Sequence, residues 1–224
     1  MIKLEKTEVV GWEHAVRGMR NPMNSWAKSD SVFDEYEIDP VDEDNKISFR
    51  QLFKIGDNDC ELMMRLAKNG PVHAKYRRMI AVYVDITAPL YWWKEFDTYK
   101  VGTVANSCST MHKIHEKEFT LSDFSCEHLS ENSANLLGEI VDELNYHRGL
   151  FITNNDKHYW WQMIQLLPSS YNQKRTIMLN YEVLAGIYPM RKNHKLDEWR
   201  KFCAWIEELP YSEIITGVEK EAKE

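Results

Sequence analysis

A β-branched segment that runs directly into a proline constrains the fold of this chain more than any other feature. Met79 to Thr87 is rich in Ile, Val and Tyr, and this composition is typical of a buried strand. Ala88-Pro89 follows at once. Because proline is favoured in the first turn of a helix, the tryptophan-rich segment after it is expected to be helical. The core must therefore accommodate a strand and an aromatic helix in immediate succession.

The rest of the chain also mixes the two periodicities. Strand patterns are expected at residues 3–10 and 176–179. Apolar residues at helical spacing predict further helices, at residues 59–68, 136–144, 159–167, 181–191 and 196–207. Loops are expected where small and polar residues gather, at residues 18–30, 39–46 and 101–111, and the last of these is expected to be functional. These patterns predict a single α+β domain over residues 1–224.

Charge and cysteine content exclude several classes of protein. The chain has 28 Lys and Arg against 35 Asp and Glu, a net charge of −7, which argues against binding nucleic acid or an anionic membrane through a basic face. The four cysteines form no Cys-x-x-Cys pair, no signal peptide is visible, and the most apolar run is too short to span a bilayer. We expect a soluble cytoplasmic protein, either a small-molecule enzyme or a binding module.

One group of side chains contains the residue types that bind zinc. It consists of His112, His115, Glu116, Cys126 and His128. The spacing matches no standard zinc site, and histidines in polar segments are usually surface residues. We therefore expect no metal site here.

Two further features have both a functional and an ordinary structural explanation. Asp57-x-Asp59-x-Glu61 resembles the beginning of a calcium loop but lacks the glycine that makes the turn, so a solvated acidic helix start is the simpler explanation. His73 precedes the predicted strand at 79–87. Its local sequence is compatible with a ligand contact and favours a packed core histidine.

A longer pattern changes the interpretation of His73. The segment from His73 to Thr103 resembles the flavin-dependent thymidylate synthases, also called thymidylate synthase complementing proteins. In that family a Gly-His segment precedes a strand, an apolar helix follows, and an Arg-His-Arg loop leads into Ser-x-Asn-Glu-x-Ser-x-Arg. Counting from the histidine, with one inserted residue before the asparagine, the matching positions are His73, Ala88-Pro89, Lys100, Thr103, Asn106 and Ser109.

A second stretch resembles the family independently. There, an Arg-x-x-Leu-Pro segment and a strand precede an Asn that begins a helix, and this helix ends in an Arg eleven residues later. Here Leu167-Pro168 is followed by Asn180 and then by Arg191. The resemblance covers about residues 57–206, and residues 1–56 are a divergent segment of strand and loops.

The resemblance implies both a fold and a reaction. The fold is a central mixed or antiparallel sheet flanked by helices. The reaction is the reductive methylation of dUMP to dTMP, a methyltransferase step of nucleotide biosynthesis in which methylenetetrahydrofolate supplies carbon and FAD reduced by NADPH supplies hydride. The implied catalytic residues are Arg191, which polarises the pyrimidine, and Ser109, which donates a hydrogen bond to it. Both bind the substrate together with Thr103.

FAD would be held by four residues, His73, Lys100, Asn106 and Asn180. Several of the implied site residues also have ordinary structural explanations. Asn106 and Ser109 are typical turn residues, Asn180 is a typical helix N-cap, and Arg191 suits the C-terminus of a helix.

The chain departs from the family at positions that carry charge. Thr98-Tyr99-Lys100 replaces Arg-His-Arg, Ser107 replaces the loop Glu, and Met111 and Ile164 replace two arginines. Thr, Met and Ile cannot make the bidentate bonds by which guanidinium groups bind phosphates. Five arginines elsewhere are candidates for replacement charge, at Arg17, Arg20, Arg77, Arg78 and Arg175.

The sequence leaves three functions open. The first is a divergent flavin-dependent thymidylate synthase-like protein that binds FAD and a pyrimidine nucleotide. The second is a catalytically degenerate member that keeps the fold for flavin or nucleotide binding or for oligomeric interaction, and the third is a histidine/cysteine metalloprotein. We also expect a homotetramer, because the family builds each flavin site from several subunits. In addition, Tyr91, Trp92, Trp93 and Phe96 point in different directions from one helix, so that some are expected to cover a partner.

Overall fold

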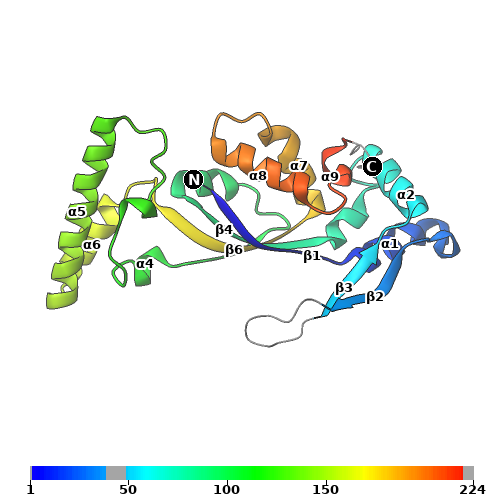
Figure 1. Cartoon of the computed structure of the whole chain (residues 1–224), viewed down its shortest axis with the longest axis horizontal. Helices are drawn as coiled ribbons and strands as arrows, with labels where there is room; N and C mark the ends of the chain where they lie inside the picture. Colours follow the sequence, from blue (N-terminus) through cyan, green and yellow to red (C-terminus); the bar gives the residue numbers. More distant parts are fainter. Residues whose placement is uncertain (1, 39–48, 219–224) are drawn as a thin grey trace. The chain divides into compact units, whose positions relative to one another are not determined.

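The computed structural model describes residues 2–38 and 49–218, which form an α+β structure with two sheets (Figure 1). The four-stranded sheet has the order β1 (Lys3–Val10), β4 (Ala81–Pro89), β6 (Asn172–Asn180), β5 (Val104–Ser107). Strands β5 and β6 are antiparallel, and Asn106 is opposite Thr176. The smaller sheet pairs β2 (Val32–Ile38) with β3 (Phe49–Lys54), also antiparallel. The loop expected at 39–46 lies outside the described residues.

The described residues divide into two compact units. The first unit contains residues 2–7, 83–178 and 193–203, and the second contains residues 8–38, 49–82, 179–192 and 204–218. Within residues 2–38 and 49–218, no helix is long and apolar enough to cross a membrane. The single-domain organisation expected from the sequence stays a prediction.

An aromatic cluster forms the core of one part of the first unit. Helix α3 (Leu90–Phe96) contributes Trp92, Trp93 and Phe96, which are at most 2% exposed. The Trp92 ring stacks on Phe96 with centroids 5.0 Å apart and lies 4.9 Å from Trp199 of α8 (Asp197–Glu208). The Trp93 indole N–H donates to the Gln173 carbonyl. Trp92, Trp93 and Phe96 are thus buried within this unit, whereas Tyr91 is half-buried. The expectation that some of the four rings cover a partner stays a prediction.

A helical pair forms the other apolar core of the first unit. Helices α5 (Glu131–Asn154) and α6 (Lys157–Leu166) lie side by side (Figure 1), and their inward-facing side chains include Leu137, Leu144 and Met163. The same core contains aromatic residues from the segment between α4 (Thr110–Lys113) and α5, which includes the short 3-10 helix η4 (Leu121–Asp123).

The second unit contains four α-helices and three 3-10 helices. The α-helices are α1 (Trp12–Arg20), α2 (Asp57–Lys68), α7 (Tyr181–Arg191) and α9 (Glu213–Thr216). The 3-10 helices are η1 (Asn21–Met23), η2 (Trp26–Lys28) and η3 (Lys75–Met79). Trp12 anchors α1 in the core, stacked on Phe53 with centroids 5.0 Å apart.

Several elements are close to the expected ranges, and others differ. Helix α5 is much longer than the expected 136–144, and β2, β3, α4 and α9 have no counterpart among the expected elements. Helix α1 ends inside the loop expected at 18–30, strand β5 lies inside the loop expected at 101–111, and β6 is longer than the expected 176–179. All four residues of β5 are exposed, so no apolar alternation marks that strand. Its antiparallel pairing with β6 involves backbone groups, which any non-proline residue supplies.

Candidate functional site

A cleft of about 850 Å³ opens in the second unit beside α1 and α2, and we call it the α1–α2 cleft. Helix α1 supplies Gly18, Met19 and Arg20 to its lining, and α2 supplies residues from one face. The segment 22–28 and the segment before β4 complete the lining. The volume falls within the range of roughly 300–1,000 Å³ that is usual for sites that bind small molecules and cofactors.

Positive charge dominates the lining of this cleft. Its charged residues are four cations and one carboxylate, at Arg20, Lys28, Arg65, Lys75 and Glu61. The chain as a whole has a net charge of −7, so this local excess runs against the overall balance. A cleft lined in this way attracts anionic ligands.

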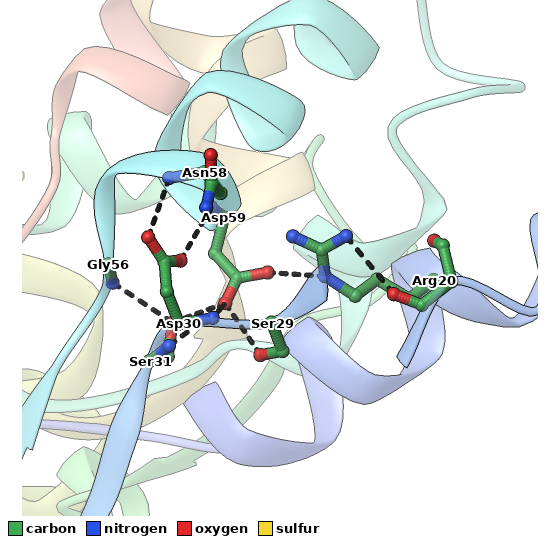
Figure 2. Close-up of polar contacts among 8 residues, drawn as sticks. Arg20, Ser29, Asp30, Ser31, Gly56, Asn58 and Asp59 are labelled. Carbon is green, nitrogen blue, oxygen red and sulfur yellow. Dashed lines mark hydrogen bonds and ion pairs between the residues drawn. The ribbon is translucent and has the colours of Figure 1, made fainter. Parts of the chain in front are cut away.

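A buried ion pair lies at the wall of the cleft. Arg20 is 4% exposed and Asp59 is fully buried, and the Arg20 Nε lies 2.6 Å from Asp59 Oδ1. The second oxygen, Oδ2, accepts hydrogen bonds from the hydroxyls of Ser29 and Ser31, each at 2.7 Å, and from the backbone N–H groups of Asp30 and Ser31 (Figure 2). Asp59 thus links the end of α1, the segment 29–31 and α2.

The electrostatic state of Asp59 follows from these contacts. Burial by itself raises the pKa of a carboxyl group, but the hydrogen bonds from Ser31, Ser29 and Arg20 outweigh it and hold the pKa of Asp59 below its usual value. The carboxylate therefore remains ionised beside Arg20. The interpretation of Asp59 as part of a solvated helix start is wrong, although its neighbours Asp57 and Glu61 are exposed.

The N-terminus of α2 is fixed by the same segment. The Asp30 carboxylate accepts hydrogen bonds from the backbone N–H groups of Asn58 at 2.9 Å and Asp59 at 3.1 Å, and the Ser31 hydroxyl accepts from Gly56 N–H (Figure 2). A Cβ at Gly56 would lie 2.2 Å from the Asp30 carboxyl carbon, so glycine is what permits this approach. All three residues of the segment 29–31 thus form hydrogen bonds with the N-terminal turn of α2 or with Gly56 before it.

His73 lines the α1–α2 cleft. Its side chain is exposed, and its backbone N–H donates to the Gly70 carbonyl at 3.0 Å. The alternative of a packed core histidine is therefore wrong. Of the seven residues implied by the family resemblance, His73 is the one that lines this cleft.

Two further implied residues mark the ends of α7 in the second unit. Asn180 is the N-cap, and its side-chain oxygen accepts a hydrogen bond from Val183 N–H at 3.0 Å. Arg191 is the last residue of the helix. The capping explanation of Asn180 is therefore confirmed, and its role toward FAD stays a prediction.

The other four implied residues belong to the first unit. Lys100 and Asn106 are exposed, and Asn106 lies on β5. Ser109 caps α4, where its hydroxyl accepts from His112 N–H at 3.0 Å. Thr103 is half-buried, and its hydroxyl oxygen has no hydrogen-bond partner among the described residues. Their roles toward FAD and substrate stay predictions.

Four of the five arginines proposed as replacement charge have a carboxylate partner, and Arg17 has the longest such contact, 3.9 Å to Glu13. Besides the Arg20–Asp59 pair, Arg77 lies 2.8 Å from Glu182, and Arg175 lies 2.7 Å from Asp97. Arg17 and Arg78 are exposed. Of these five arginines, Arg20 is the one that lines the α1–α2 cleft.

The two positions at which the resemblance expects arginine carry apolar side chains in the first unit. Met111 is 46% exposed, and Ile164 packs against the core that contains Leu144 and Met163. In the described ranges, no three His, Cys, Asp or Glu side chains come together as a metal-binding group. His128 instead pairs with Asp197 at 3.0 Å.

No protein-family model matches the chain, and no curated protein matches it. Solved structures of similar fold do exist. Two crystal structures of the flavin-dependent thymidylate synthase ThyX from Helicobacter pylori, both with FAD and dUMP, each match with a TM-score of 0.65 at 16% identity, over 96% of this chain and 97% of theirs. The chain therefore has the fold of these enzymes, an α+β structure with an antiparallel sheet flanked by helices.

Proposed function

We propose that this protein is a divergent flavin-dependent thymidylate synthase-like protein that binds FAD and a pyrimidine nucleotide. The observation that carries the proposal is the likeness of nearly the whole chain to enzyme structures that contain FAD and dUMP. The ordered motif matches at His73, Asn106, Asn180 and Arg191 support it from the sequence. NADPH and methylenetetrahydrofolate as co-substrates, a homotetramer and a cytoplasmic location belong to the same proposal.

Two features of the structure fit such ligands. The α1–α2 cleft places His73 beside an excess of cations, which suits a ligand that carries phosphate groups. The buried Thr103 hydroxyl oxygen has no hydrogen-bond partner in the described part of the chain, and a bound ligand would supply one.

The proposed chemistry assigns a small number of tasks to this chain. Bound FAD, once reduced, supplies the hydride. Arg191 places a fixed cation where negative charge develops on the pyrimidine, and a guanidinium suits this task because it stays protonated at neutral pH. The Ser109 hydroxyl donates a hydrogen bond to the substrate. Lys100, Asn106 and Asn180 orient the flavin.

Flavin binding is the first test. FAD added to the purified protein is expected to raise the melting temperature by mass action, because it binds the folded state and not the unfolded chain. Absorbance near 450 nm after removal of free FAD reports the same binding independently. An unchanged melting temperature at saturating FAD would contradict the proposal.

A catalytically degenerate member of the family is the second candidate. It is favoured by the packing of Ile164 in an apolar core and by the exposed thioether of Met111, since neither position supplies a guanidinium. Release of tritium from C5 of labelled dUMP, with NADPH and methylenetetrahydrofolate present, separates the two candidates. A protein that binds FAD but releases no tritium is the degenerate one.

A further inference from the structure

Arg20 combines two properties that rarely occur together in an arginine. Its exposed fraction is only 4%, yet it lines the α1–α2 cleft. It is the last residue of α1, and α1 packs through Trp12, Ala15, Val16 and Met19 on the same unit's core. A guanidinium in this position is held by the protein and still belongs to the lining of the cleft.

The hydrogen bonds of Arg20 leave part of its guanidinium available. Its Nε donates to Asp59 Oδ1 at 2.6 Å, and one N–H of Nη1 donates to the Ser25 carbonyl at 3.3 Å. In Figure 2 the other terminal nitrogen has no dashed contact. Since arginine has five N–H donors, three have no partner among residues 2–38 and 49–218.

Asp59 fixes the guanidinium through Nε and leaves two of its terminal donor groups unbonded to the carboxylate. Its Oδ2 accepts four hydrogen bonds from the segment 29–31, and only Oδ1 faces Arg20. These hydrogen bonds stabilise the carboxylate and hold it in place. A carboxylate held in this way sets the direction of the arginine. The arginine therefore loses little conformational entropy when a ligand binds.

Further cations surround the same space. Lys28, Arg65 and Lys75 line the cleft and are exposed, and none of them has a carboxylate partner in the described part of the chain. The single lining carboxylate, Glu61, does not balance them. A phosphate group, with its charge and several acceptor oxygens, matches one anchored guanidinium and several exposed cations.

We infer that the α1–α2 cleft binds a phosphate group through Arg20 and that Asp59 is the positioning residue of this arginine. This inference rests on the proposed function, because it names the group of the ligand that this cleft holds. Two sources supply the same chemistry, the diphosphate of FAD and the monophosphate of the nucleotide. Arg20 would then provide, from a new position, charge that Met111 and Ile164 do not.

The test compares ligands with and without phosphate on the full-length protein. Dissociation constants are measured for FAD against riboflavin and for dUMP against deoxyuridine, in the parent and in Arg20→Lys. Arg20→Lys removes the forked arrangement of N–H donors that a guanidinium offers to phosphate. It is expected to weaken the binding of one phosphate-bearing ligand about ten- to hundredfold and the binding of its phosphate-free analogue less than about twofold. The ligand pair that shows this difference identifies the source. Arg17→Lys, an exposed change in the same helix that does not line the cleft, is expected to alter neither pair.

Asp59→Asn tests the positioning role. It keeps the shape of the side chain but removes its charge, and it is expected to lower the ratio of phosphate-bearing to phosphate-free affinity. A purely structural role would weaken both ligands of a pair equally. Thermal melts of each variant establish that the compared proteins are folded.

Three results would overturn the inference. They are unchanged affinities in folded Arg20→Lys, equal losses for both members of each pair, and a ligand-bound crystal structure of the parent with no phosphate oxygen within hydrogen-bond distance of Arg20. The last applies even if the variants do not fold.

If the parent binds neither FAD nor dUMP, the proposed function fails, and titration with inorganic pyrophosphate decides the inference separately. Pyrophosphate binding that Arg20→Lys weakens supports it, and no binding overturns it.

Discussion

Asp59 differs from its acidic neighbours in its tertiary contacts and not in its local sequence. Asp57, Asp59 and Glu61 are alternate residues in the first two turns of α2, and any of them suits the positive end of a helix. Only Asp59 meets Ser29, Ser31 and Arg20, which lie 28 to 39 residues away in the chain. Because these partners are remote, no local pattern predicts which carboxylate is buried.

Removal of this carboxylate is expected to be costly. Asp59→Ala leaves the buried Arg20 guanidinium without its ion-pair partner, and breaking a buried pair in this way typically lowers the free energy of unfolding by about 3–5 kcal/mol. Asp57→Ala, at an exposed position in the same turn, is expected to cost about 1 kcal/mol or less. Urea unfolding of the two variants measures the difference, and equal midpoints would contradict the role of Asp59.

The pH dependence of stability has a definite sign at the same residue. The pKa of Asp59 is lower in the folded than in the unfolded chain, so its contribution is complete above the unfolded pKa of about 3.9 and is lost as the pH falls through the folded pKa. The parent is therefore expected to be more stable than Asp59→Asn at neutral pH, and this difference in stability is expected to shrink as the pH falls below about 4. Urea midpoints measured from pH 7 to pH 2.5 check this, and a constant advantage over that range would disprove it.

At the scale of elements, burial decides which segments can be predicted. Helix α5 is predictable because Leu137, Val141 and Leu144 face one core at helical spacing. Strand β5 is not, because its residues are all exposed and it is defined by its pairing with β6. Helix α1 carries a signal that was missed: Trp12, Ala15, Val16 and Met19 are spaced as on one helical face and are all buried.

Asn180 joins a structural task with a proposed functional one. As N-cap of α7 it accepts a hydrogen bond from Val183 N–H, so Asn180→Ala is expected to cost about 1 kcal/mol of stability. Asn180→Asp keeps an acceptor for the cap and is expected to unfold close to the parent. Chemical denaturation tests the cap, and FAD titration of Asn180→Asp tests the flavin role. An Asn180→Ala variant as stable as the parent would remove the capping explanation.

At the scale of the whole molecule, the positions of the sequence motifs agree with the fold, whereas the roles of individual site residues stay predictions. The matches at Ala88-Pro89 and at Asn180 fall at strand-to-helix junctions of the structure, so their spacing reflects the topology. The angle between consecutive positions of α3 does not by itself limit burial, because a core can reach around a helix. Phe96, Trp199 and Phe202 surround Trp92, while the Arg175 guanidinium lies over the Trp93 ring, 4.1 Å from its centroid.

Activity is where the lost arginines are expected to matter most. Each charge-assisted contact absent from a buried site typically costs about 1.5–3 kcal/mol. If no other cation replaces the two contacts missing at Met111 and Ile164, dUMP binding is weakened by about 3–6 kcal/mol, on the order of a hundredfold to ten-thousandfold. We therefore expect little dTMP from dUMP under standard conditions. Any residual tritium release is expected to disappear in Arg191→Ala, because the polarising cation is then absent.

Restoring one of these charges gives the sharper form of this prediction. Met111 is 46% exposed, so Met111→Arg adds a guanidinium without creating a cavity or burying an unpaired charge. It is expected to tighten dUMP binding about tenfold or more and to raise tritium release. Leu136→Arg, at a position on α5 that is 57% exposed, adds the same charge outside the motif and is expected to change neither. If both variants bind dUMP equally, the effect is one of net charge, and the assignment of Met111 to the family's arginine position is wrong.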